Sequence, residues 1–469
     1  MEFGIVAGMA LLIKNGTLVN ADGRQRADLY AEGETITRLG PGLDAPPGAE
    51  ILDAAGKLVF PGFIDPHTHI YLPFMGTYSK DGYASAGRAA LLGGTTTLFD
   101  MCIPGRGVRP WEGFDTWMAQ AAGQAACDYS FHLGIGGSGR EYWAEMADLV
   151  EQKRIPSFKV FLAYKDALHI EDDELYETLK MARRLGVRTT AHCENAQLVH
   201  EHQAQLLAAG KTDPEWHHDS RPPVVEALGV HHLCTFAELT GAPVYIVHLS
   251  CEQALDAALD ARARGVEVAI ETLIQYLLLS HDDTKRPDFE GSKFVMSPPL
   301  RDRRHQDILW KALADGTIDT LATDHAPFDF AGQKEMGRGD FTRIPNGIPS
   351  LEERVKLLYS EGVAKDRLSP ERFVEVASTN AAKLFGLYPR KGVLAPGSDA
   401  DIVIYDPDAR SVISADTHSM QVDYSAFEGW EVTGRPETVV LRGQVAVRDG
   451  EFVGEAGRGQ FLPRNPVER

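Results

Sequence analysis

Two histidines at strand spacing are the first residues in this sequence that suggest metal chemistry. His67 and His69 stand two positions apart in "PGFIDPHTHIYLP", directly after an apolar run. In a β-strand, residues i and i+2 share one face and lie about 7 Å apart along it, so both imidazoles can reach one metal ion. Taken alone, the pair fits two structural histidines equally well. Whether His67 and His69 bind a metal therefore depends on whether the other apolar runs end in further metal-binding residues.

Four further residues of metal-binding type lie in or at the end of later apolar runs. They are Lys159 in "SFKVFL", His192 in "VRTTAH", His248 in "VYIVH" and Asp324 in "DTLATD". In a parallel barrel the carboxyl ends of all strands open at one mouth, where active sites are built. The recurrence favours one metal site over several unrelated structural residues. Imidazole and carboxylate ligands suit zinc, and manganese or cobalt would also fit.

Lys159 has an unusual setting, because apolar residues such as Phe158 and Val160 flank it. A charged lysine is costly to bury unpaired. The alternatives are a buried carboxylate partner or a lowered pKa that frees the amine as a nucleophile. A neutral amine can add carbon dioxide to give a carbamate, N6-carboxylysine, whose two oxygens could bridge two divalent cations. His192 and His248 would then supply nitrogen ligands for the second ion.

Asp324 offers an oxygen ligand and, beside a metal-activated hydroxide, a proton acceptor. The next residue, His325, is expected to orient Asp324 or another ligand. Together these residues predict a hydrolytic site that uses two divalent ions.

The elements expected around these residues are alternating strands and helices. From about residue 62 to 388, short apolar runs alternate with helical patterns. Ser369 is expected to cap one helix, and Ser250 with Gln253 to form a capping box at the start of another. This alternation predicts an α/β fold, a (β/α)8 TIM barrel. A doubly wound sheet has less support, because no glycine-rich phosphate loop is present.

Both ends of the chain are instead rich in short β-type runs and turn dipeptides. They predict one small β-sandwich domain built from residues 9–61 and 389–450, enclosing the catalytic barrel at 62–388. Residues 1–8 are expected to be an extension, native or added. Residues 451–469 are expected to form a C-terminal tail that contributes to oligomer contacts.

The overall composition limits the partners of this protein. The chain has 469 residues, of which 43% are hydrophobic and 24% charged, and its net charge is −20. That charge opposes binding to nucleic acid and to anionic membranes. The five cysteines form no CxxC pair, which favours a reducing cytoplasm. We therefore expect a cytoplasmic protein with no nucleic-acid or membrane partner.

A set of longer motifs adds a family resemblance that covers residues from about 11 to 464. It rests on "PGFIDPHTHI", "SFKVFLAYK", "TAHCENAQLV", "IVHLS", "FVMSPPLRD", "TDHAPF", "IPNGIPSLEER" and "STNAAKLFGLYPRKGVLAPGSDADIVIYDP". These resemble the cyclic amidohydrolases of the dihydropyrimidinase and D-hydantoinase family. The resemblance implies a homotetramer and a binuclear centre. It implies that His67, His69 and Asp324 hold one ion, that His192 and His248 hold the other, and that carboxylated Lys159 and a hydroxide bridge them.

The same resemblance implies which residues contact the substrate. Tyr164 would bind the carbonyl oxygen that becomes an oxyanion, and Ser297 and Asn346 would bind the amide edge of the ring. Leu72 and Phe74, in the loop after the first barrel strand, would line the pocket for the ring substituent. Phe161 would line the same pocket.

The predicted reaction is the hydrolytic opening of a cyclic diamide. The expected substrates are 5,6-dihydropyrimidines and 5-substituted hydantoins, which would give N-carbamoyl amino acids. The alternatives are an allantoinase, a dihydroorotase or a non-catalytic scaffold of the same fold. Dihydroorotase must bind a substrate carboxylate, for which arginine is the natural partner. In that relative an arginine stands at the next same-face position after the His-x-His pair, where this sequence has Tyr71.

Overall fold

Eight parallel strands form a barrel at the centre of the molecule. The structure is a computed structural model that describes residues 10–165 and 167–466. Each strand pairs with its neighbours in chain order. The ring closes where the backbone N–H of His69 donates to the carbonyl of His325 at 2.9 Å. The strands are β8 (Phe63–Thr68), β11 (Thr95–Cys102), β12 (Asp128–Gly134), β13 (Ser157–Phe161), β14 (Arg188–His192), β15 (Val244–Ile246), β16 (Val268–Leu273) and β17 (Thr320–Ala322).

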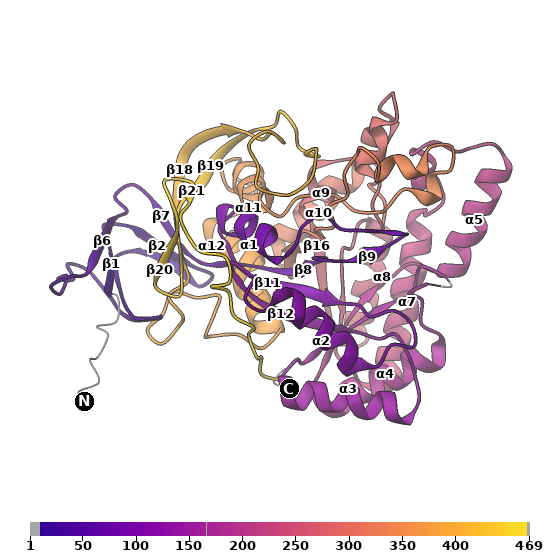
Figure 1. Cartoon of the computed structure of the whole chain (residues 1–469), viewed down its shortest axis with the longest axis horizontal. Coiled ribbons are helices and arrows are strands. Elements are labelled where there is room, and N and C mark those ends of the chain that lie inside the picture. Colours follow the sequence, from indigo (N-terminus) through magenta and orange to yellow (C-terminus); the bar gives the residue numbers. More distant parts are fainter. Residues whose placement is uncertain (1–9, 166, 467–469) are drawn as a thin grey trace.

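Helices follow the strands and surround the barrel, as Figure 1 shows. This arrangement confirms the predicted (β/α)8 fold. Ser369 caps α12 as expected, accepting a hydrogen bond from the backbone N–H of Arg372. The helices are α1 (Tyr83–Leu92), α2 (Pro110–Ala121), α3 (Arg140–Lys153), α4 (Asp172–Leu185), α5 (Ala196–Ala208), α6 (Trp216–Asp219), α7 (Pro223–Thr240), α8 (Glu252–Ala263), α9 (Ile274–Leu278), α10 (Arg304–Asp315), α11 (Arg354–Leu358), α12 (Pro370–Val374) and α13 (Asn380–Leu384).

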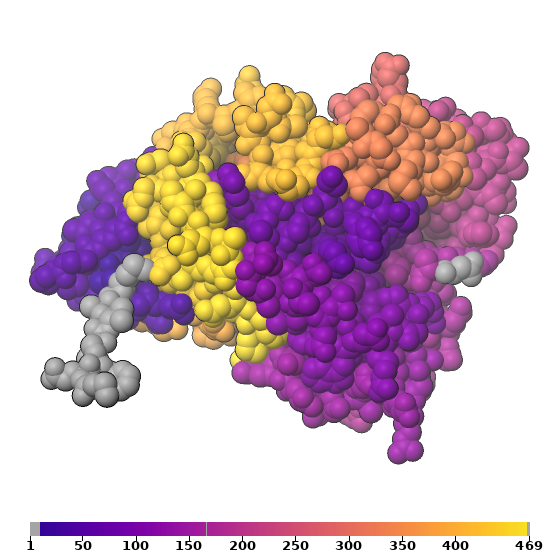
Figure 2. Space-filling view, viewed as in Figure 1, coloured from indigo at the N-terminus to yellow at the C-terminus, as the bar shows by residue number. Residues whose placement is uncertain are grey.

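The two ends of the chain meet in a pair of smaller sheets beside the barrel, where the indigo and yellow segments adjoin in Figures 1 and 2. Side chains such as Leu29, Val59 and Ile404 bury themselves between the sheets. One sheet contains β5 (Thr35–Gly40), β4 (Asp28–Glu32), β1 (Ala10–Lys14) and β6 (Glu50–Asp53). The other contains β21 (Glu451–Phe452), β20 (Gln444–Arg448), β19 (Glu431–Leu441), β18 (Ile402–Val412), β7 (Leu58–Pro61), β2 (Thr17–Asn20) and β3 (Gly23–Arg26).

This β-sandwich from both chain ends was part of the predicted fold class, and the paired sheets confirm it. The domain boundaries proposed at residues 61/62 and 388/389 stay predictions. The expectation for residues 1–8 lies outside the described residues. None of the described helices is both long and apolar enough to span a membrane.

The capping box predicted at the start of α8 is wrong. The N-cap residue is Cys251, with no side-chain cap bond. The hydroxyl of Ser250 instead donates to the carboxylate of Glu226 and accepts from the guanidinium of Arg301 at 2.9 Å. All three side chains are buried, and hydrogen bonds to buried charged groups are stronger than a cap bond between neutral groups.

The C-terminal tail packs on the amino-terminal ends of the barrel strands. The backbone N–H of Leu462 donates to the carbonyl of Tyr129 at 2.7 Å. The buried guanidinium of Arg464 donates to the hydroxyl of Ser157 at 2.7 Å and to the carbonyl of Phe131. The described part of the tail is therefore bound to its own barrel, and its contribution to oligomer contacts stays a prediction.

Candidate metal centre

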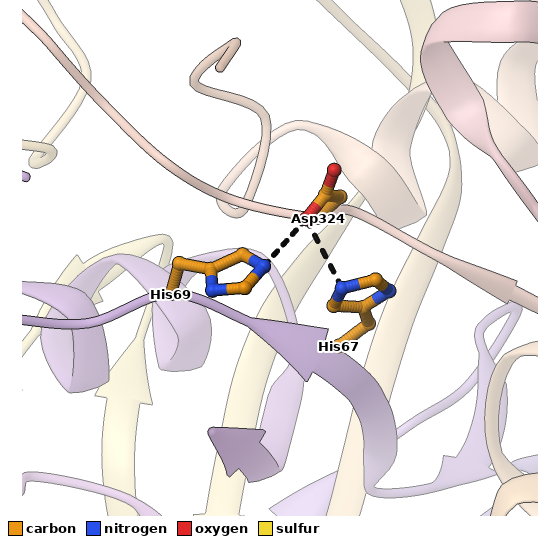
Figure 3. A group of neighbouring side chains, drawn as sticks. All are labelled: His67, His69 and Asp324. Atoms are coloured by element: carbon orange, nitrogen blue, oxygen red, sulfur yellow. Dashed lines mark ion pairs between the residues drawn. The ribbon is translucent and has the colours of Figure 1, made fainter. Parts of the chain in front are cut away.

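Three of the predicted ligands surround one point at the carboxyl ends of the barrel strands. His67 lies in β8, His69 directly after it, and Asp324 two residues after β17. The Nε2 atoms of His67 and His69 lie 3.1 Å and 2.9 Å from the same Oδ1 atom of Asp324. Figure 3 shows the three side chains pointing toward one another. Nitrogen and oxygen donors at this spacing match the ligand set of a divalent metal.

The second predicted pair of ligands adjoins the first. His192 is the last residue of β14, and His248 follows β15 by two residues. Their ring centroids lie 4.5 Å apart, and the rings of His248 and His67 lie 5.4 Å apart. Burial lowers the pKa of both His192 and His248 well below the usual value. Both imidazoles are therefore neutral and available as nitrogen ligands.

Lys159 is fully buried in the middle of β13, between these groups. Burial lowers the pKa of its amine to about 8, against the opposing effect of the Asp324 and Glu271 carboxylates. In the described part of the chain, no carboxylate comes within ion-pair distance of Nζ, which also has no hydrogen-bond partner there. The alternative of a lysine neutralised by direct pairing therefore does not apply.

Other buried nitrogens of the site also lack hydrogen bonds. Nε2 of His67 lies 3.1 Å from Oδ1 of Asp324 without the geometry of a hydrogen bond, and Nδ1 of His248 forms no hydrogen bond within residues 10–165 and 167–466. Buried polar atoms are nearly always satisfied in native proteins. Nitrogens without hydrogen bonds in a cluster that also holds a carboxylate fit a site for cations.

Two buried glutamates accept hydrogen bonds from the imidazole nitrogens that face away from the site. Glu271 in β16 accepts from Nδ1 of His67 at 2.7 Å and from the backbone N–H of His248 at 2.9 Å. Glu194 accepts from Nε2 of His192 at 2.7 Å. A carboxylate can only accept, so each ring carries its proton on the side facing the glutamate and presents its other nitrogen to the site.

Neither glutamate is among the residues predicted from the sequence. The signal for Glu271 was a carboxylate inside the apolar run "VAIET", which continues into a buried strand. Such a residue needs a buried partner. Glu194 follows its strand by two residues and carried no comparable signal.

The charges of the site favour a cation. Burial raises the pKa of the Asp324 carboxyl, but His67 and His69 hold it well below its usual range. Burial lowers the pKa of His67, yet the carboxylates of Asp324 and Glu271 outweigh burial and raise it to about 8. The pKa of His69 is lowered to about 4 by burial. Two buried carboxylates thus create a negative potential at His67.

Backbone conformation also marks the site. Tyr164, His248 and Asp324 have positive φ angles of 62°, 41° and 50°. This region is uncommon for residues other than glycine, and such strain concentrates at functional sites. His325 has a different place from the one expected, because its ring Nε2 bonds Asp81 at 2.9 Å. Its backbone carbonyl accepts a hydrogen bond from the backbone N–H of the predicted ligand His69 at 2.9 Å.

Five of the six predicted ligands, all except His67, line a cavity that also contains the predicted substrate contacts. Asn346 donates to the hydroxyl of Ser297 at 3.0 Å on one wall. A wider cavity of about 340 Å³ adjoins it, lined by residues that include Phe74, Met75 and Tyr164. The predicted contacts that line the inner cavity are Leu72, Phe74, Phe161, Tyr164, Ser297 and Asn346.

Tyr71 does not occupy the position expected from strand spacing. β8 ends at Thr68, and Tyr71 has a φ of 55°. Its ring packs on Tyr78 and Trp117, at centroid distances of 5.8 Å and 6.4 Å. It lines neither cavity. The expectation that Tyr71 shares a face with His67 and His69 is therefore wrong, because strand β8 ends at Thr68, before it reaches Tyr71.

Comparisons with known proteins agree with this geometry. The model of the Amidohydrolase family matches residues 58–446. A D-hydantoinase from Geobacillus stearothermophilus is 47% identical over 97% of both chains. A D-hydantoinase (dihydropyrimidinase) from a Thermus species is 54% identical with a TM-score of 0.96, covering 97% of this chain and 99% of that one. A dihydropyrimidinase from Brevibacillus agri is 43% identical with a TM-score of 0.97, covering 98% and 100%.

Proposed function

Because this chain belongs to the Amidohydrolase family, we propose that it hydrolyses the cyclic amide bond of 5-substituted hydantoins and 5,6-dihydropyrimidines to N-carbamoyl amino acids. The observation that carries the proposal is the unpartnered, buried amine of Lys159. It stands among four histidines and one aspartate, and all of these except His67 line the inner cavity. That arrangement suits a carbamate between two ions and has no evident structural purpose.

The residues present fit two divalent ions per chain, Zn²⁺ first, with Mn²⁺ or Co²⁺ as alternatives. We propose that His67, His69 and Asp324 hold one ion and that His192 and His248 hold the other. Lys159, carboxylated by carbon dioxide, would lie between them. When bound, such ions supply a hydroxide at neutral pH and polarise the scissile carbonyl.

Asp324 would transfer the proton, and Tyr164 would stabilise the negative charge that develops on the carbonyl oxygen. Asp324 is ionised at neutral pH, so it can accept the proton of the attacking hydroxide and deliver it to the leaving ring nitrogen. Burial raises the pKa of Tyr164 to about 12. Its hydroxyl therefore keeps its proton and can donate a hydrogen bond to the oxyanion of the tetrahedral intermediate.

The polar wall formed by Ser297 and Asn346 would hold the amide edge of the ring. The apolar side chains of Leu72, Phe74 and Phe161 would contact the substituent at carbon 5, which extends toward the wider cavity. This division fits a ring with one polar edge and one variable substituent.

The arginine that lines the cavities is not free to bind the carboxylate of dihydroorotate. Arg221 is the arginine among the residues that line the two cavities. Its guanidinium is already bound to Glu194 at 2.6 Å. A ring carboxylate would therefore compete with a buried ion pair. The ion pair between Arg221 and Glu194, and not Tyr71, therefore disfavours dihydroorotate as the substrate.

The quaternary structure and location of the enzyme are part of the proposal. Among the described residues all five cysteines are free and buried, which suits a reducing cytoplasm. The family resemblance supports a homotetramer. Sedimentation equilibrium of the purified protein would test that assembly, since a monomer or dimer at working concentration contradicts it.

The substrate is tested by comparing kcat/KM for four rings on protein of measured metal content. We expect dihydrouracil and a 5-substituted hydantoin to be hydrolysed far faster than dihydroorotate and allantoin. A higher kcat/KM for dihydroorotate or allantoin would contradict the proposed substrate class and support a dihydroorotase or an allantoinase. No hydrolysis of any ring by metal-loaded protein would support a non-catalytic scaffold.

A further inference from the structure

A second cluster of metal-binding side chains lies outside both active-site cavities. His218 belongs to the short helix α6, and His281 begins the helical turn η1 (His281–Lys285). Asp302 follows the buried Arg301. One ligand atom from each of His218, His281 and Asp302 lies within 4.8 Å of the other two. Three segments far apart in the sequence thus converge with two nitrogens and one oxygen.

The two imidazoles of the cluster are held face to face. Their centroids lie 3.9 Å apart and their planes differ by 15°. The side chains of His218 and His281 are only 15% and 13% exposed, whereas that of Asp302 is 63% exposed. The cluster is therefore ordered by its neighbours yet open to ions from solvent.

Hydrogen bonds on the outer side of each ring fix which nitrogen is free. Nδ1 of His218 lies 3.0 Å from Oδ1 of Asp219, and Nε2 of His281 lies 3.3 Å from the carbonyl oxygen of Glu215. Carboxylate and carbonyl oxygens only accept, so these two nitrogens carry the protons. The lone pairs therefore remain on Nε2 of His218 and Nδ1 of His281. This is how ligating histidines are normally supported in metal sites.

The distance between His281 and Asp302 is closer to that of two ligands of one ion than to that of a direct hydrogen bond. Nδ1 of His281 lies 4.0 Å from Oδ1 of Asp302, which is too far for a hydrogen bond. Two atoms bound to one tetrahedral zinc ion at about 2.1 Å each lie about 3.4 Å apart, so His281 and Asp302 would approach each other slightly on binding. The lone pair of each imidazole lies in its ring plane, so one of the two stacked rings must rotate before both nitrogens and Asp302 can bind one ion. Water would complete the coordination.

We propose that His218, His281 and Asp302 form an additional divalent-metal site, distinct from the catalytic centre. Two nitrogen ligands and one carboxylate favour Zn²⁺ or another ion of similar softness, such as Ni²⁺, Cu²⁺ or Co²⁺, over Mg²⁺ and Ca²⁺. The site does not depend on the proposed function, because none of its ligands lines an active-site cavity.

An ion at this site would tie α6 to the segments that carry His281 and Asp302. The residue before His218 shows why that matters. Nε2 of His217 lies 2.9 Å from the carbonyl oxygen of Met296 and 3.2 Å from the hydroxyl of Ser297. The additional ion would therefore support the wall of the active site that contains Ser297, and its binding should stabilise the folded protein.

The test counts the ions bound by the metal-loaded protein. Wild-type protein and variants are dialysed against a series of Zn²⁺ concentrations, and bound zinc per chain is measured by elemental mass spectrometry. We expect wild type to bind one more ion per chain than His218→Ala or His281→Ala. His231→Ala, which removes an exposed histidine of α7, is the matched control and should bind as many ions as wild type.

A subtler variant separates ligation from folding. Asp219→Asn leaves all three ligands in place but weakens support of the His218 ring, so we expect the additional ion to bind about 10- to 100-fold more weakly. Zinc should also raise the thermal midpoint of wild type more than that of His218→Ala. Equal zinc counts and equal shifts of the thermal midpoint in wild type and His218→Ala would show that the cluster is a stacked histidine pair that binds no ion. Unchanged zinc affinity in Asp219→Asn would exclude the supporting role of Asp219.

Discussion

At the residue scale, Lys159 is the side chain whose surroundings are hardest to explain without chemistry. Its amine is fully buried and has no hydrogen-bond or ion-pair partner in the described part of the chain, where it lies 4.8 Å from the centre of the Phe161 ring. The pKa lowered to about 8 leaves a substantial neutral fraction near neutral pH. A neutral amine is the form that adds carbon dioxide, so the same burial that is costly for an ammonium prepares the proposed carbamate.

Replacing Lys159 by alanine should remove the group that bridges the proposed ions. We expect kcat/KM for a 5-substituted hydantoin to fall by at least about 100-fold. Formate or acetate should restore part of the activity, because a small carboxylate can enter the space left and supply two anionic oxygens. Chloride at the same ionic strength is the control. Near-wild-type turnover of Lys159→Ala with its metals restored would contradict the bridging role.

Glu271 should control metal affinity although it touches no proposed ion. Its carboxylate accepts from His67, His248 and Tyr245. Glu271→Gln removes the negative charge with little change in shape, so we expect zinc to bind about 10- to 100-fold more weakly. Competition with a coloured chelator measures this. Glu177→Gln, which changes an exposed helix residue, should leave the affinity unchanged, and equal affinities for all three proteins would exclude the role.

The sequence was sufficient to place the proposed ligands but not their supports. His67, His192, His248 and Asp324 could be selected because each stands in or just after an apolar run that becomes a barrel strand. The bond from Glu271 to His67 joins residues 204 positions apart, and no local pattern encodes such a distance. Tyr71 shows the opposite error, since spacing alone did not reveal where β8 ends.

At the element scale, the turn η3 (Lys334–Gly337) holds the loop that carries Asn346. The buried Nζ of Lys334 donates to the carbonyls of Val295, Pro345 and Gly347 at 3.0, 2.7 and 2.7 Å. An ammonium has three donors, and here each meets one carbonyl. Lys334 therefore joins the residues on both sides of Asn346 to the segment that leads to Ser297.

Lys334→Met should loosen this wall while leaving the metal ligands in place. We expect KM for dihydrouracil to rise about tenfold, with a smaller change in kcat and an unchanged metal content, because the three freed carbonyls no longer fix the loop. Lys285→Met, which removes an exposed lysine paired with Asp282, is the control. A fall in kcat together with metal loss, at constant KM, would indicate a general structural defect instead.

Element types were easier to predict than the contacts at their ends. Ser369 forms the expected cap because α12 begins at the surface, where its hydroxyl meets only the helix. Ser250 has the same local signal but lies beside Glu226 and Arg301, which are buried and charged. The tertiary network therefore determines the partner of that hydroxyl.

At the scale of the whole molecule, the chain closes on itself at the base of the barrel. Arg464 is fully buried there, although it lies near the end of the sequence. Its guanidinium lies over the rings of Phe99 and Phe385, at 4.9 Å and 5.9 Å. The tail therefore contributes to the stability of a barrel whose first strand begins about 400 residues earlier.

Arg464→Met should destabilise the protein without changing its chemistry. The variant leaves the acceptors of Phe131 and Ser157 without a charged donor, and we expect a loss of about 3 kcal/mol. Thermal unfolding should show a lower midpoint, while kcat per bound metal stays constant at low temperature. Arg390→Met, at a partly exposed ion pair with Asp399, should shift the midpoint much less. Equal shifts for the two variants would contradict the structural role of the tail.

The most direct test of the account returns zinc to chelator-treated protein in the presence of bicarbonate while bound metal and hydantoin hydrolysis are measured together. Activity should be absent at first and should reach its maximum when the catalytic centre holds two ions per chain. His218→Ala, which lacks the additional site, makes this count unambiguous. Full hydrolysis by the metal-free protein, or a maximum at one ion per chain, would contradict the binuclear centre built around Lys159.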